Sequence, residues 1–127
     1  MSNTKKYSGF RDLIAYKFSY QLAVQIFSET KSFPKEEKYA LVDQIRRSAR
    51  AVPAIIAEAW SRRRYPKSFI SKLLEAYGEA SETKVWLDFS RNHDYLESKK
   101  YDYFKSKYDE FSRMFYSIIN QPEKFCY

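Results

Sequence analysis

A stripe of apolar residues with helical spacing constrains the fold of this chain more than any other feature. Its members follow one another at intervals of three or four residues: Val42, Ile45, Ala49, Val52, Ile56 and Ala59. Residues at this spacing share one face of an α-helix. Pro53 lies inside the same stretch, where its ring lacks an N–H donor and crowds the preceding turn. The pattern therefore predicts an amphipathic helix that is bent at Pro53.

Three further segments have the same periodicity. We expect helices from Phe10 to about Lys31, from just after Phe33-Pro34 to about Arg62, from Pro66 to the turn at His93, and through a last stripe to Asn120. The third stripe is Phe69, Leu73, Ala76, Ala80, Thr83 and Leu87, and the fourth is Tyr101, Phe104, Tyr108, Phe111, Phe115 and Ile118. The 127 residues include only two glycines and four prolines, which favours long helices joined by short connections. We predict an all-α, up-down-up-down four-helix bundle over residues 10–120, with tails at 1–9 and 121–127.

The first expected helix carries two apolar lines side by side. One is Leu13, Tyr16, Tyr20, Ala23, Phe27 and Thr30, and the other is Ile14, Phe18, Leu22 and Ile26. A helix in a bundle normally buries an arc of about 100°. The wider arc predicts that this helix also contacts another subunit, although a small bundle can equally leave tyrosines half-exposed at its surface.

Residues with catalytic or metal-binding chemistry are sparse. His93 is the single histidine and lies in an expected turn near Asp88 and Asp94, whereas a di-metal bundle or a histidine-dependent hydrolase needs several convergent partners. Glycine-rich phosphate loops are absent from the sequence. Glu58 and Glu82 could form an acid/base pair, but Glu58 stands four residues before Arg62, at the spacing of a helix ion pair. We therefore expect no enzymatic activity, no cofactor and no metal.

Trp60 and Trp86 have two possible roles. Each could stack on nucleic-acid bases, and each could equally pack in the core or at an interface. The second role is favoured.

Basic residues concentrate in one region. The chain carries a net charge of +7, and the span Arg46–Lys72 contains eight basic residues against one acid, so the rest of the chain is neutral overall. These eight are the candidate nucleic-acid-binding residues: Arg46, Arg47, Arg50, Arg62, Arg63, Arg64, Lys67 and Lys72. Arginines bind phosphates in a salt-dependent and sequence-tolerant way, and Tyr65 could stack on a base. The alternative is a solvated face with favourable cations at a helix C-terminus.

The expected compartment is the cytoplasm. Cys126 is the single cysteine, which excludes an internal disulfide. The first ten residues lack the apolar run of a signal peptide, and no segment approaches the roughly 20 apolar residues of a membrane span. We expect no membrane association.

Several short segments together resemble a known family. They are Phe10–Leu13, Phe33-Pro34 with Glu37 and Tyr39, Gln44–Ala49, Val52–Ala54, Ile56–Glu58, and Ala76–Gly78 with Glu82. In order and spacing they resemble the four-helix bundle proteins encoded in intervening sequences of bacterial 23S rRNA genes, formerly labelled S23 ribosomal proteins. Ile55 and Ala59 depart from the asparagine and glycine that are usual in that family.

The resemblance has functional implications. A relative, the accessory variability protein of diversity-generating retroelements, is a ring-like pentamer that binds nucleic acid and a reverse transcriptase. The resemblance thus implies a homo-oligomer, with a pentamer favoured, and a reverse transcriptase or another protein as a possible partner. We predict a non-enzymatic oligomeric bundle that binds RNA or DNA without sequence specificity. The alternative is a structural or protein-interaction module with no nucleic-acid role.

Overall fold

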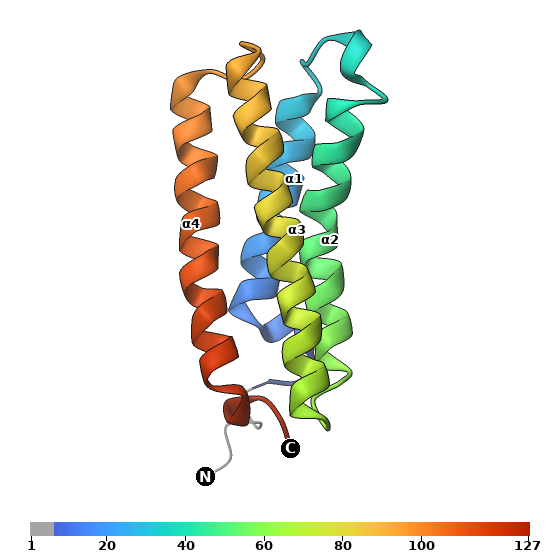
Figure 1. The fold of residues 1–127 in the computed structure, drawn as a ribbon, viewed down its shortest axis with the longest axis vertical. Helices are drawn as coiled ribbons and strands as arrows, with labels where there is room; N and C mark the ends of the chain where they lie inside the picture. The colour runs from blue at the N-terminus through green and yellow to red at the C-terminus, as the bar shows by residue number, and fades with distance from the viewer. Residues whose placement is uncertain (1–6) are drawn as a thin grey trace.

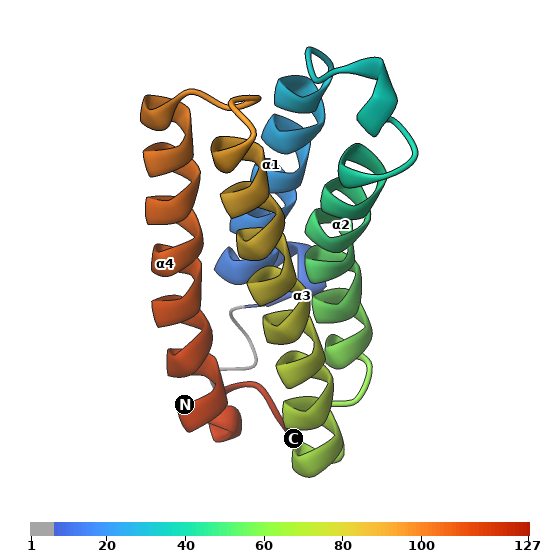
Figure 2. The same ribbon diagram turned by 45° about the horizontal axis from the view of Figure 1, so that its top comes forward.

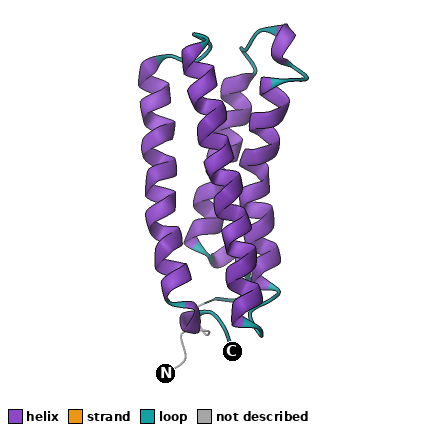
Figure 3. Ribbon diagram, viewed as in Figure 1, coloured by secondary structure: helices purple, strands orange, loops and turns teal. Residues whose placement is uncertain are grey.

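The computed structural model describes residues 7–127 as an antiparallel helical bundle. In this part of the chain the long helices are α1 (Ile14–Thr30), α2 (Leu41–Trp60), α3 (Pro66–Asn92) and α4 (Ser98–Asn120). Helices that follow one another in sequence run in opposite directions (Figure 1), and no strand occurs among the described residues (Figure 3). The predicted all-α four-helix bundle is confirmed.

Two of the predicted helices begin later than expected. Residues Phe10–Asp12 form a separate 3-10 turn, which closes because the Asp12 carboxylate accepts hydrogen bonds from the Ser8 and Gly9 amides at 2.6 and 3.3 Å. Residues Lys35–Glu37 form a second 3-10 turn before α2. The Glu37 carboxylate still lies at the start of α2, where it accepts a hydrogen bond from the Leu41 amide at 3.3 Å.

The predicted stripes of α2, α3 and α4 form the core. Each residue of the α2 stripe is at most 5% exposed and each of the α3 stripe at most 2%. In α4, the four central stripe residues are buried, whereas Tyr101 and Ile118 at its ends are half-buried. Full burial of a large apolar side chain contributes about 1.5–3 kcal/mol, so the large residues of these three stripes stabilise the bundle substantially.

The inward face of α1 lies between the two predicted apolar lines and takes members from both. Its buried residues are Ala15, Ser19, Leu22, Ala23, Ile26 and Thr30. Ser19 and Thr30 are tolerated there because each hydroxyl donates to a carbonyl one turn earlier, at 2.8 Å. On the flanks, Ile14 is 69% exposed and Tyr20 is 49% exposed. Apolar side chains therefore remain on the surface of α1, and their expected contact with another subunit stays a prediction.

Pro53 is buried within α2 and does not end the helix, which continues to Trp60. Because proline has no N–H, the carbonyl of Ala49 loses its usual donor there. The bend expected at Pro53 stays a prediction.

A small polar layer crosses the core between α2, α3 and α4. Thr83 donates a hydrogen bond to Ser48 Oγ at 2.8 Å, and both residues are fully buried. The hydroxyl of Tyr108 is buried beside them and has no hydrogen-bond partner among the described residues. Burial raises the pKa of Tyr108 far above its ordinary value, and the neighbouring Thr83 hydroxyl offsets this only in part.

Candidate functional site

The eight candidate basic residues lie in three separate parts of the bundle. Arg46 and Arg50 stand one turn apart on the side of α2 that faces α1, Arg47 and Lys72 lie between α2 and α3, and the remaining four occupy the α2–α3 turn and the first turn of α3. At 1.5 Å per residue, Arg46 and the end of α2 are about 21 Å apart. The eight side chains therefore do not form one continuous patch.

Arg46 links α2 to the end of α1. Its Nε donates to Thr30 Oγ1 at 2.8 Å, one amino group donates to the Phe27 carbonyl at 3.3 Å, and its guanidinium lies 4.3 Å from the centre of the Phe27 ring. Partial burial lowers the pKa of Arg46, and the nearby charge of Arg50 lowers it further. These contacts indicate a structural role for Arg46.

Arg47 links α2 to α3 through two carboxylates. It forms ion pairs with Glu79, at 3.3 Å, and with Glu82. Glu82 also accepts a hydrogen bond from the indole nitrogen of Trp86 at 3.1 Å. Although burial alone would lower it, the two carboxylates raise the pKa of Arg47. This arrangement neutralises Arg47 and assigns Glu82 to a tertiary ion pair.

Glu58 interacts with cations on both sides of the α2–α3 turn. Its carboxylate lies 3.8 Å from Arg62 and 3.3 Å from Lys72, and Lys72 also lies 3.4 Å from Glu75. The ion pair expected between Glu58 and Arg62 from their four-residue spacing is thus present. Glu58 and Glu82 hold different cations, so they do not form an acid/base pair. Exposed pairs of this kind contribute little to stability, about 0–1 kcal/mol.

Arg63 is held by the C-terminal segment. Its guanidinium lies 3.5 Å from the centre of the Trp60 ring and 4.8 Å from that of Tyr127, and the Tyr127 amide donates to the Arg63 carbonyl at 3.3 Å. Phe125 is 9% exposed and stacks on Phe69 at 6.2 Å. The last residues therefore pack on the end of the bundle (Figure 2), and Tyr127 contacts Arg63.

Five of the eight residues belong to none of the ion pairs found within residues 7–127: Arg46, Arg50, Arg63, Arg64 and Lys67. Arg46 and Arg63 are held by the hydrogen bonds and ring contacts described above, which leaves Arg50, Arg64 and Lys67. Arg64 and Lys67 are exposed at the α2–α3 turn together with the weakly paired Arg62. Tyr65, the expected stacking residue, is 64% exposed between them. Among the eight candidate residues, the exposed positive charge is therefore concentrated at this turn.

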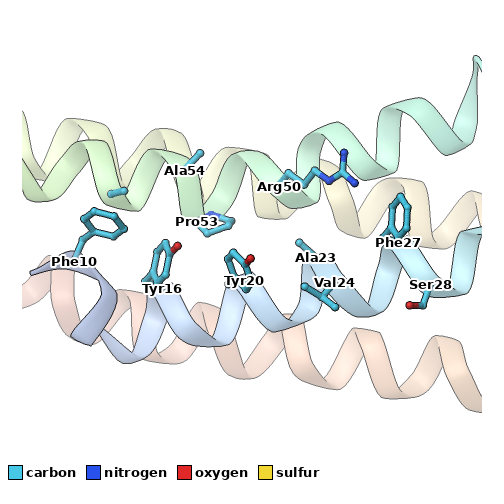
Figure 4. Close-up of a pocket in the computed structure, with 11 residues that line it drawn as sticks. Phe10, Tyr16, Tyr20, Ala23, Val24, Phe27, Ser28, Arg50, Pro53 and Ala54 are labelled. Atoms are coloured by element: carbon cyan, nitrogen blue, oxygen red, sulfur yellow. The ribbon is translucent and has the colours of Figure 1, made fainter.

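A groove between α1 and α2 was not predicted. It encloses about 520 Å³ and is lined by aromatic rings of α1 and the preceding turn, by small residues of α2, and by Arg50 (Figure 4). Its α2 wall is low because Pro53, Ala54 and Ala57 face α1. The surplus apolar line of α1 was the available signal, but a single helix does not reveal which neighbour stands opposite.

The other candidate residues occupy ordinary positions. His93 is exposed at the end of α3, as predicted, beside the rings of Phe89 and Tyr95 at 5.9 and 5.6 Å. Trp60 and Trp86 are half-buried against the core, which confirms the favoured interpretation. Residues 7–127 contain no group of three potential metal ligands and no helix that could span a membrane.

Fold and surface together define a small antiparallel helical-bundle protein with exposed basic residues at the turn between α2 and α3. Comparison with known families then identifies it: the chain belongs to the 23S rRNA-intervening sequence protein family, whose model matches residues 11–117. A similar solved structure is that of a protein with unknown function from the S23 ribosomal protein family of Bacteroides thetaiotaomicron VPI-5482. It is 30% identical with a TM-score of 0.75, and the match covers 84% of this chain and 96% of that one. No match was found among curated proteins.

Proposed function

We propose that this protein is a non-enzymatic, oligomeric bundle that binds nucleic acid without sequence preference through the α2–α3 turn. The observation that carries this proposal is the exposed group of Arg62, Arg64 and Lys67, of which the last two have no carboxylate partner among the described residues. The family description, which refers to a 23S rRNA intervening sequence, favours RNA as the first nucleic acid to test.

The mechanism is electrostatic. Each cation that neutralises a phosphate releases condensed counterions, so affinity falls as the salt concentration rises. Of the eight predicted residues, Arg46, Arg47 and Arg63 are occupied by contacts within the chain, which leaves the turn as the main phosphate-binding surface. Tyr65, between these cations, adds a ring on which a base can stack.

Fluorescence anisotropy with structured RNA and duplex DNA over a series of salt concentrations tests this proposal. The double variant Arg64→Ala/Lys67→Ala should weaken binding to both probes. It should also reduce the slope of log affinity against log salt concentration by the amount expected for the loss of about two phosphate contacts. Lys35→Ala/Lys38→Ala is the matched control, because it removes the same charge from the opposite end of the bundle (Figure 1). Equal effects of the two double variants, or no binding at low salt, would contradict the proposal.

Self-association is the second part of the proposal. Ile14 is 69% exposed on α1 and lies beside the half-buried Phe18, outside the groove between α1 and α2, and burial of such a surface against another subunit is favourable. An oligomer would bring several basic turns together and raise avidity. The family resemblance favours a pentamer. Light scattering at micromolar concentration measures the mass, and a monomer of 15.3 kDa would refute self-association.

The same exposed surface supports the alternative function, a protein-interaction module. In that case the α1 face would bind a different protein, for which a reverse transcriptase is one candidate. Pulldown after nuclease treatment separates the two: loss of all partners indicates binding through nucleic acid, whereas retention of a protein that Ile14→Glu releases indicates the alternative.

A further inference from the structure

The groove between α1 and α2 contains a row of aromatic rings. Phe10 and Tyr16 have ring centres 5.1 Å apart, Tyr16 and Tyr20 are 5.8 Å apart, and Phe27 lies two turns further along α1 (Figure 4). From Tyr16 to Phe27 the row extends about 16 Å at the rise of an α-helix. The volume of the groove, about 520 Å³, is typical of a ligand site.

Cations stand at both ends of this row. Arg11 lies 4.6 Å from the centre of the Phe10 ring at one end. At the other end Lys31, Arg46 and Arg50 lie 5.1, 4.3 and 5.2 Å from the centre of the Phe27 ring. None of the residues that line the groove carries a carboxylate. The groove therefore presents apolar ring surface along its length and positive charge at its ends.

We propose that this groove binds an unpaired segment of nucleic acid, with bases stacked on the α1 rings and phosphates contacting Arg50 and Arg11. Stacking on aromatic side chains, combined with cations along the backbone, is the usual way in which proteins hold single strands. The bases of a duplex are already stacked and cannot enter a groove between two adjacent helices. This inference rests on the proposed nucleic-acid function and names the form of nucleic acid that is bound.

A neutral apolar helix from a second copy fits the groove less well. Its docking would cover Arg50 without supplying a carboxylate, and an unpaired buried charge is costly. The phosphates of a single strand would pair with the cations at both ends, and its bases would stack on the rings between them. The charge pattern therefore favours a single strand over self-association at this groove.

The first experiment removes one ring. Tyr20 is 49% exposed, so Tyr20→Ala should leave the helical circular dichroism unchanged. It should weaken binding of a fluorescent oligouridylate of about 12 nucleotides by about tenfold, whereas Tyr20→Phe, which keeps the ring, should bind like the parent. A duplex probe of equal length should bind all three proteins equally, because its affinity depends on the α2–α3 turn.

The second experiment fills the groove without changing any charge. Ala57→Leu places a larger side chain on the α2 wall and should weaken oligouridylate binding, while Gln44→Leu, at an exposed position of α2 outside the groove, should not. If Tyr20→Ala and Ala57→Leu bind the oligouridylate like the parent while duplex binding persists, this inference is overturned and the proposed function stands. If neither probe binds the parent protein, both fail. If instead these two variants change the mass measured by light scattering and not the affinity, the groove is a subunit interface and this inference is overturned.

Discussion

Tyr108→Phe tests whether the buried polar layer limits the stability of the bundle. The side chain is fully buried, and its hydroxyl has no hydrogen-bond partner among the described residues. A buried polar group without a partner costs about 1–3 kcal/mol relative to water. Phenylalanine keeps the ring and removes only that oxygen. The Thr83 hydroxyl is close enough to recover part of this cost in the parent protein. We therefore expect Tyr108→Phe to raise the free energy of unfolding by an amount near the lower limit, about 1 kcal/mol at neutral pH.

The same residue makes stability depend on alkaline pH. In the unfolded chain Tyr108 ionises near its ordinary pKa of about 10, whereas in the folded protein burial keeps it neutral to much higher pH. A folded-state pKa above the unfolded value leaves stability unchanged below pH 10 and lowers it progressively above. The loss is about 1.4 kcal/mol per pH unit. At about pH 11 the free energy of unfolding of Tyr108→Phe should therefore exceed that of the parent by roughly 2.5 kcal/mol.

Urea unfolding followed by circular dichroism, at about pH 7 and about pH 11 with a reductant for Cys126, measures both effects. Tyr20→Phe is the control, because it removes the same atom from an exposed side chain and should change neither value. A destabilised Tyr108→Phe at neutral pH would show that the hydroxyl makes a useful hydrogen bond. If the free energy of unfolding falls by the same amount in the parent and the variant between the two pH values, Tyr108 ionises normally in the folded protein. Either result would refute the reasoning.

Two further predictions separate structural from accessible residues. Arg46→Ala should lower the free energy of unfolding by about 1–2 kcal/mol, because it removes two hydrogen bonds and a cation–π contact, whereas Arg64→Ala should leave urea unfolding unchanged. Equal effects would contradict the assignment of Arg46 to the α1–α2 contact. Phe125→Ala should cost about 3 kcal/mol in the same assay, since it removes a buried ring from the end of the bundle, and a cost below about 0.5 kcal/mol would show that the last residues do not pack there.

The sequence by itself determined the fold class and the inward faces of three helices. In α2, α3 and α4 the predicted stripes are the faces that the bundle buries, although α3 also carries Leu74, Val85 and Phe89 exposed outside its stripe. Residues such as Ile56, Leu73 and Phe111 could therefore be assigned to the core without knowledge of their neighbours. The sequence also located the excess positive charge, because the rest of the chain is balanced.

Only the tertiary structure decided which surface each remaining residue occupies. Helix α1 has apolar residues over a wide arc, so its periodicity permits several orientations, and packing against α2 and α4 selects the face between the two lines. Arg46 and Arg47 are adjacent in sequence, yet Thr30 fixes one and Glu82 neutralises the other, at separations of 16 and 35 residues. Local spacing reports only on contacts within a helix. The partners that occupy an arginine, and the groove that two helices enclose, arise between helices, which is why the sequence alone did not reveal them.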